Sequence, residues 1–156
     1  MNRLFHVLLK SLPGITICLG LGSLSGLVVR ARNLAWYATL MKPSFTPPSY
    51  LFGPVWTLLY ILMGISLTMI WETRSEHPVL TWLFFVQLAL NVFWSPVFFY
   101  AQRIDLALLV IIALWLALLA CLVLSWHSKP LFLLWIPYFL WTSFASILNA
   151  SLYLLN

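Results

Sequence analysis

Apolar residues fill five long blocks of the chain, and short polar segments separate these blocks. The blocks cover about residues 9–29, 50–71, 79–101, 105–126 and 131–153. Because the apolar core of a bilayer is about 30 Å thick, a helix needs about 20 residues to cross it, and each block has about that length. The pattern therefore predicts an all-α integral membrane protein in which residues 1–156 form one bundle of five transmembrane helices.

The few polar residues inside the blocks indicate which helix faces turn inward. Gln87, Asn91 and Ser95 recur every four residues in the third block. Uncharged amides in a bilayer pair with another helix or face a cavity, so this stripe is expected to link helices or to contact a ligand inside the bundle. Pro96 removes a backbone donor, and it is expected to kink the helix and free the carbonyl near Val92.

Small and aromatic residues mark further helix faces. In the first block, the small residues Gly14, Cys18, Gly22 and Gly26 recur every four residues. Such a stripe lets another helix approach closely, and packing within the same chain is favoured over packing with a second copy. Two similar stripes begin with a tryptophan in the second and fifth blocks: Trp56, Tyr60 and Gly64, and Trp141, Ala145 and Asn149.

The linker between the first two blocks contains three prolines, Pro43, Pro47 and Pro48. Proline lacks an amide donor and holds the preceding residue extended, so a stiff, non-helical connection is expected from Trp36 onward. Residues 31–49 are therefore expected to fold over one end of the bundle as a lid.

Composition excludes several classes of protein. Hydrophobic residues make up 63% of the chain and charged residues only 7%, whereas about a quarter of the residues in a water-soluble domain are charged. The net charge of +5 comes from Lys and Arg spread over the predicted membrane surfaces, which favours lipid headgroups over nucleic acid as a partner. Cys18 and Cys121 lie inside apolar blocks without a metal or haem motif, so no metal site and no cofactor is predicted.

The ionisable side chains lie in or beside the predicted connections. Coupled pumps carry such groups at membrane depth, so a coupled pump is not expected. His6, His77 and His127 are expected at one membrane face and outside the helices, which argues against axial haem ligation. Basic residues divide four to four between the two faces, so charge does not predict the orientation.

Three groups of motifs stand out along the chain. The first is Trp36-Tyr37, Lys42-Pro43, Pro47-Pro48, Phe52-Gly53-Pro54-Val55-Trp56, Leu59-Tyr60 and Met63-Gly64. The second is Gln87, Asn91, Trp94-Ser95, Phe98-Phe99 and Asp105, and the third is Pro137-Tyr138, Trp141, Phe144-Ala145 and Leu148-Asn149. Together they resemble the signature of the tryptophan-rich sensory protein family, also called the translocator protein or peripheral-type benzodiazepine receptor family.

The composition of these motifs, aromatic with a few neutral amides, is typical of a pocket for a flat apolar ligand. The resemblance implies that this ligand is a tetrapyrrole such as protoporphyrin, with haem and sterols as further candidates. The predicted ligand-binding residues are Trp36, Tyr37, Pro47, Trp56, Tyr60, Gln87, Asn91, Trp94, Trp141, Ala145 and Leu148. No Lys or Arg follows Tyr153, so the sterol motif that animal relatives carry at this end is missing.

The resemblance also implies a biological setting. We expect a receptor- or transporter-like protein of tetrapyrrole homeostasis or stress signalling that forms a homodimer, with the lid and the C-terminus facing the cytosol. The membrane would be the cell membrane of a bacterium or the outer mitochondrial membrane of a eukaryote.

Two alternative functions remain open. One is an enzyme that degrades porphyrin with light and oxygen, in which Trp56 and Trp141 would be the catalytic residues because an excited porphyrin can oxidise a stacked indole. No acid, base or metal site is predicted that would support a conventional reaction. The other alternative is a membrane scaffold without a ligand, which would have no affinity for porphyrin.

Overall fold

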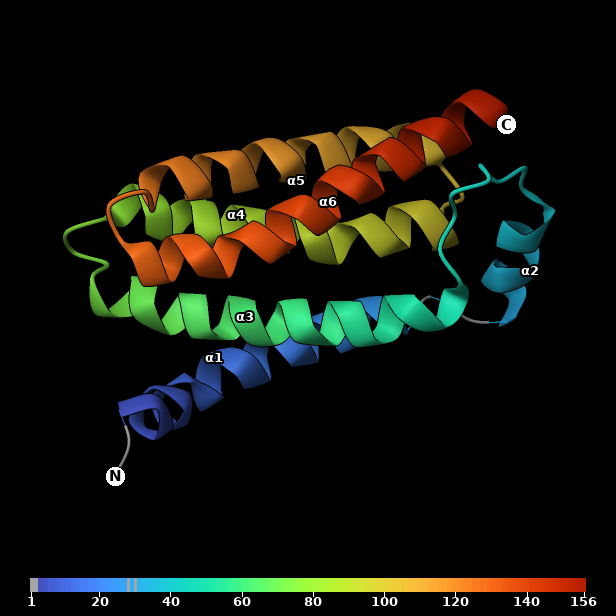
Figure 1. The fold of residues 1–156 in the computed structure, drawn as a ribbon. Helices are drawn as coiled ribbons and strands as arrows, with labels where there is room; N and C mark the ends of the chain where they lie inside the picture. Colours follow the sequence, from blue (N-terminus) through green and yellow to red (C-terminus); the bar gives the residue numbers. More distant parts are fainter. Residues whose placement is uncertain (1–2, 28, 30) are drawn as a thin grey trace.

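The computed structural model describes residues 3–27, 29 and 31–156, which form a bundle of long helices (Figure 1). The long helices are α1 (Arg3–Gly26), α3 (Phe52–Glu72), α4 (Pro78–Ser95), α5 (Ile104–Leu124) and α6 (Lys129–Leu155). Within the described residues, five helical segments are long and apolar enough to cross a membrane. The predicted all-α fold and its five spans are confirmed.

The helix ends differ from the predicted blocks mainly in α1. This helix begins at Arg3 and ends at Gly26, whereas the apolar block was expected to run from residue 9 to residue 29. Hydropathy marks the part of a helix that lies in the bilayer, and α1 begins before this block and passes through His6. The block therefore locates the span but not the helix start.

Helix α1 packs closely against α3 (Figure 1). A Cβ atom added to Gly14 would lie 2.5 Å from the carbonyl oxygen of Gly64, and one added to Gly22 would overlap the ring of Tyr60. Cys18, between these glycines, is fully buried. The prediction that the small-residue stripe packs within the chain is confirmed for these positions, whereas a Cβ atom on Gly26 would meet no neighbour within 4 Å.

At Pro96 the α-helix α4 ends, and the carbonyl of Val92 is free of its helical partner, as expected. A π-helical segment, Pro96–Tyr100, follows the α-helix directly. Because Pro96 has no amide hydrogen, the carbonyl of Val92 lacks its usual helical donor. The hydroxyl of Ser25 on α1 donates to this carbonyl at 2.7 Å, so the freed acceptor joins α1 to α4.

The linker prediction was wrong in its first part. Residues Ala31–Thr39 form the short helix α2, although a non-helical connection was expected from Trp36 onward. All three prolines of the linker come after Thr39, so no residue before that point breaks a helix. Beyond α2 the chain is irregular until a 3₁₀ turn, Ser49–Leu51, leads into α3. Helix α2 lies at the end of the bundle that also holds the C-terminus (Figure 1).

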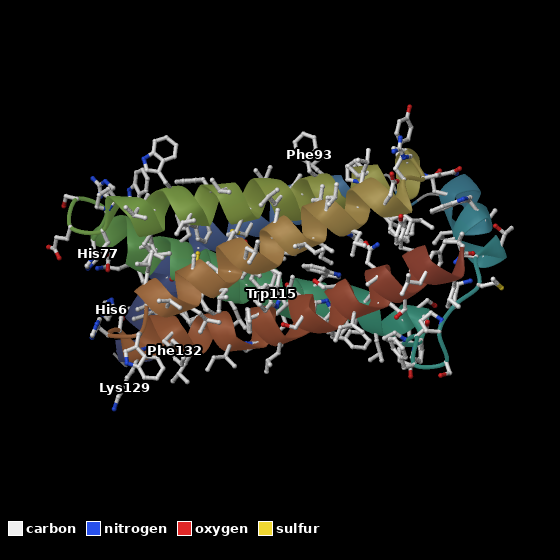
Figure 2. All side chains as sticks on the ribbon, turned by 90° about the horizontal axis from the view of Figure 1, so that it is seen from above. His6, His77, Phe93, Trp115, Lys129 and Phe132 are labelled. Atoms are coloured by element: carbon white, nitrogen blue, oxygen red, sulfur yellow. The ribbon has the colours of Figure 1, made fainter. Side chains whose placement is uncertain are left out.

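The opposite end of the bundle carries the histidines. His6, His77 and Lys129 lie together at this end, far from α2 (Figure 2). His127 belongs to the turn between α5 and α6 at the same end. The common end expected for the three histidines is therefore confirmed, but the expectation that none lies in a helix was wrong for His6, which is part of α1.

Candidate ligand-binding site

Aromatic rings from α3 and α6 meet in the interior of the bundle. The ring of Trp56 stacks on Tyr60, with ring centroids 5.7 Å apart and an interplanar angle of 29°. The same indole meets the ring of Tyr138 edge to face at 6.3 Å. Tyr138 is almost fully buried, whereas Trp56 and Tyr60 are half-buried. These rings form an apolar surface with one side still accessible.

A chain of hydrogen bonds holds these rings in place. The Tyr60 hydroxyl donates to Oδ1 of Asn91 at 2.7 Å, and Nδ2 of Asn91 donates to the Tyr138 hydroxyl at 2.7 Å. Asn91 thus uses both sides of its amide to join α3, α4 and α6. The structure favours the role of a link between helices for this residue.

Trp94 also has its polar edge occupied. Its Nε1 donates to Oδ1 of Asn149 at 3.1 Å, and Nδ2 of Asn149 donates to the carbonyl of Ile104 at 3.2 Å. The Trp94 ring stacks on Phe98 with centroids 5.0 Å apart. Trp94 can therefore offer a ligand only the remaining ring surface, because its N–H is already used.

Gln87 and Trp141 differ from these residues because their polar atoms have no partner within the described part of the chain. Both amide atoms of Gln87 are buried and unpaired, and so is Nε1 of Trp141. A buried polar group without a hydrogen bond costs about 1–3 kcal/mol. Among the predicted site residues, these two therefore have polar atoms that a ligand or an internal water would satisfy.

The first part of the linker docks on the π-helical segment. The ring of Trp36 meets Phe98 edge to face at 5.6 Å, and the ring of Tyr37 meets Phe98 at 6.1 Å and Phe99 at 5.8 Å. Burial raises the pKa of the Tyr37 hydroxyl above its ordinary value, so this group stays neutral at physiological pH. Helix α2 thus closes the end of the bundle through aromatic contacts.

The second part of the linker docks on α6. The ring of Phe45 meets Phe144 at 6.3 Å. The backbone N–H of Met41 donates to Oδ1 of Asn156 at 2.9 Å, and Nδ2 of Asn156 donates to the carbonyl of Met41 at 3.0 Å. The Asn156 side chain thereby forms hydrogen bonds with both the N–H and the carbonyl of Met41, as the backbone of a paired β-strand would.

Trp141 lies next to the point where the linker docks, because its ring contacts Phe144, the partner of Phe45. Its ring meets Phe52, at the start of α3, at 5.9 Å and lies 5.6 Å from Phe144. The indole with the unpaired N–H is therefore flanked by aromatic rings, one of which, Phe144, also contacts the linker.

The structure brings the predicted residues together in two neighbouring clusters. Trp56, Tyr60 and Trp141 pack against the main core, and Trp36, Tyr37, Trp94 and Leu148 belong to a second core around Phe98. Pro47 and Ala145 are half-buried, and no specific contact joins their described side chains to the other predicted residues. Gln87 lies fully buried in α4.

Sequence reasoning left Tyr138 and Phe98 out of the site. Tyr138 completes the hydrogen-bond chain, and Phe98 receives Trp36, Tyr37 and Trp94. Both residues occur in the motifs of the sequence, and Tyr138 lies three residues before Trp141, on the same helix face. That spacing was the signal for including it.

Comparison with known proteins places this architecture in a family. The profile of the TspO/MBR family matches residues 14–154, nearly the whole chain. The chain belongs to the TspO/MBR family. As a member of this family with five candidate spans among its described residues, it is a multi-pass integral membrane protein.

Relatives within the TspO/MBR family align over most of their length. The chain is 42% identical to the tryptophan-rich protein TspO of Archaeoglobus fulgidus over 151 residues, which is 96% of this chain and 98% of the relative. It is 36% identical to the translocator protein of Bos taurus, over 87% of this chain and 84% of the relative. It is 34% identical to the tryptophan-rich sensory protein of Cereibacter sphaeroides, over 78% and 77% respectively.

Proposed function

We propose that this TspO/MBR protein binds porphyrins, such as protoporphyrin or haem, beneath the lid formed by residues 31–49. It would act as a receptor or transporter-like protein in tetrapyrrole homeostasis or stress signalling. The observation that carries the proposal is the buried, unpaired N–H of Trp141, whose ring lies between Phe52 and Phe144 beside the docking point of the linker. Family membership and the names translocator and sensory protein among the relatives support a ligand-handling role.

The chemistry of a porphyrin suits this site. Its flat conjugated ring can stack on indole and phenol rings, and each aromatic pair is worth about 0.5–1.5 kcal/mol beyond the burial of area. Its carboxylate side chains are acceptors that the N–H of Trp141 could satisfy. The Gln87 amide, with one donor group and one acceptor group, would satisfy a second polar edge deeper in the bundle.

Opening of the lid would give a ligand access to Trp141, because Phe45 of the linker docks on Phe144, which contacts the Trp141 ring. If only residues 40–49 move and α2 stays docked on Phe98, the contacts that would have to break are those of Phe45 with Phe144 and of Met41 with Asn156. They are a ring contact and two exposed hydrogen bonds, each of which contributes little on its own. A lid held in this way can open without unfolding the helices.

The test is a titration of the purified protein with protoporphyrin, followed by quenching of tryptophan fluorescence. Trp141→Phe keeps a ring but loses the N–H, and it is expected to weaken binding several-fold. Trp126→Phe is the matched control, since Trp126 is exposed and packs edge-on against Phe132, outside the site. Equal affinities in wild type and Trp141→Phe would contradict the proposal.

A second candidate function is the breakdown of porphyrin with light and oxygen. It is favoured by the contacts of Trp56 with Tyr60 and Tyr138, which place oxidisable rings side by side. Under this function, Trp56→Phe and Trp141→Phe would keep much of the affinity for porphyrin but lose its light-driven bleaching. The bleaching is measured as the loss of porphyrin absorbance under illumination in air. If the bleaching rate depended only on the concentration of free porphyrin and was the same in both variants as in wild type, the protein would bind porphyrin without degrading it.

A further inference from the structure

A groove opens on the outside of the bundle at the end opposite the lid. It lies at the turn from α3 to α4 and has a volume of about 390 Å³. Its lining residues are Trp71, Arg74, Pro78, Thr81, Trp82 and Phe85. His77, in the same turn, lies at the end of the bundle that also carries His6 and Lys129 (Figure 2). The groove is therefore far from the lid, and it lies on the exposed face of α4, whereas Gln87 of the proposed porphyrin site is fully buried.

The structure fixes the guanidinium of Arg74 at the outer end of this groove. Nη1 donates to the carbonyl of Trp71 at 2.7 Å, and the guanidinium carbon lies 4.7 Å above the centre of the Trp71 ring. No carboxylate among the described residues forms an ion pair with Arg74, and the nearby Glu72 is paired with Lys10 at 3.1 Å. The remaining N–H groups of Arg74 are thus available to an outside acceptor.

The inner wall of the groove is apolar and faces the bilayer. Trp82 is 73% exposed and Phe85 is 41% exposed, so both rings stand on the outer surface of α4. Pro78, Trp82 and Phe85 follow one another at about one turn each, so the wall extends about 10 Å along the helix from the turn. The order from the membrane surface inward is therefore cation first and aromatic rings next.

We propose that this groove binds a membrane phospholipid, with its phosphate on the guanidinium of Arg74 and the start of an acyl chain along Trp82 and Phe85. The charge of the phosphate complements the unpaired guanidinium, and a planar guanidinium binds phosphate oxygens in a two-pronged geometry. The order of the groove matches the order of the lipid, in which the charged phosphate lies outside the acyl chains. A free phosphate would use Arg74 but would leave the aromatic wall empty.

Native mass spectrometry of the purified protein in detergent, titrated with phosphatidylglycerol, tests this proposal. Arg74→Gln is expected to raise the dissociation constant of the first bound lipid about tenfold, because a charge-assisted contact is lost. Lys129→Gln is the matched control, since it removes the same charge at the same end of the bundle but outside the groove. Its lipid affinity is expected to stay near that of wild type.

A second pair of variants tests the apolar wall. Trp82→Ala is expected to weaken lipid binding several-fold, whereas Trp126→Ala, another exposed tryptophan outside the groove, leaves it unchanged. Glycerol phosphate in excess is expected not to displace the lipid. All four substituted side chains are exposed, so melting temperatures near that of wild type are expected for the four variants. These side chains are Arg74, Trp82, Trp126 and Lys129.

Several results would overturn the proposal. Unchanged affinity in Arg74→Gln, or an equal loss in Lys129→Gln, would mean that the lipid does not use this groove. Displacement of the lipid by an excess of glycerol phosphate would make a free phosphate the ligand. If Trp82→Ala changed the share of dimers but not the bound lipid, the groove would hold a second copy of the chain instead.

Discussion

At the scale of single residues, the amides on α4 have different roles although they share one stripe. Asn91 is satisfied on both sides by tyrosine hydroxyls from two other helices. Gln87, one turn earlier, is buried with both amide atoms unpaired. The stripe predicted that both residues face inward, but the partner of each depends on Tyr60 and Tyr138, which come from other helices. Spacing within one helix cannot reveal that difference.

This difference predicts opposite effects of the same substitution. Asn91→Leu removes the partner of two hydroxyls, and it is expected to destabilise the protein by about 1–3 kcal/mol. Gln87→Leu replaces an unpaired buried amide with an apolar group of similar size, and it is expected to leave the ligand-free protein as stable or more stable. Thermal unfolding in detergent measures both effects.

Porphyrin titration of Gln87→Leu completes this test, because the proposed site predicts weaker binding without a loss of stability. If Gln87→Leu destabilised the ligand-free protein as much as Asn91→Leu, the amide would have a structural partner, and its role in the site would be withdrawn.

At the scale of elements, the linker combines a short helix with an irregular segment that Asn156 holds. Its prolines allowed the prediction of a stiff connection, but they constrain only the part after Thr39. Its docking partners are distant in sequence, since Met41 and Asn156 are 115 residues apart. Neither proline chemistry nor helical periodicity links residues so far apart, so the structure was needed to identify them.

The two hydrogen bonds between Met41 and Asn156 hold the irregular part of the linker, so their loss is expected to open the lid more often. Asn156→Ala removes two hydrogen bonds to the Met41 backbone, and it is expected to speed limited proteolysis within residues 40–49 several-fold. Leu154→Ala is the control, because Leu154 is 82% exposed on the same helix and makes no described contact with the linker. Porphyrin is expected to slow cleavage in wild type, and equal cleavage with and without porphyrin would count against a lid.

At the scale of the whole molecule, the spans could be predicted because the thickness of the bilayer core sets the length of each apolar block. The interior faces could be predicted where a stripe stood out from its surroundings, as in Gly14, Cys18 and Gly22. Which helices pack against each other could not be predicted, because a close approach also needs a matching surface on a second helix. Gly64 on α3 is that surface for Gly14.

The packing of α1 against α3 bears on the homodimer that the family resemblance implies. Small residues and amides can also join helices of two copies, but Gly14 and Gly22 of α1 and Asn91 of α4 make their contacts within the chain. Gly20, in contrast, is exposed, and an added Cβ would meet nothing within 4 Å. The homodimer remains a prediction, and any contact through α1 would involve an outward position such as Gly20.

Alanine substitutions at these two glycines separate packing within the chain from assembly. Gly14→Ala places a methyl group against the Gly64 carbonyl, and it is expected to lower stability by about 1–3 kcal/mol at every protein concentration. Gly20→Ala adds a methyl group in open space, and the better helix propensity of alanine is expected to raise stability by about 0.5–1 kcal/mol. Thermal unfolding over a range of concentrations, together with crosslinking in native membranes, measures both effects. If Gly14→Ala left the melting temperature unchanged but abolished a crosslinked dimer, the stripe would serve assembly, and its packing against α3 would be refuted.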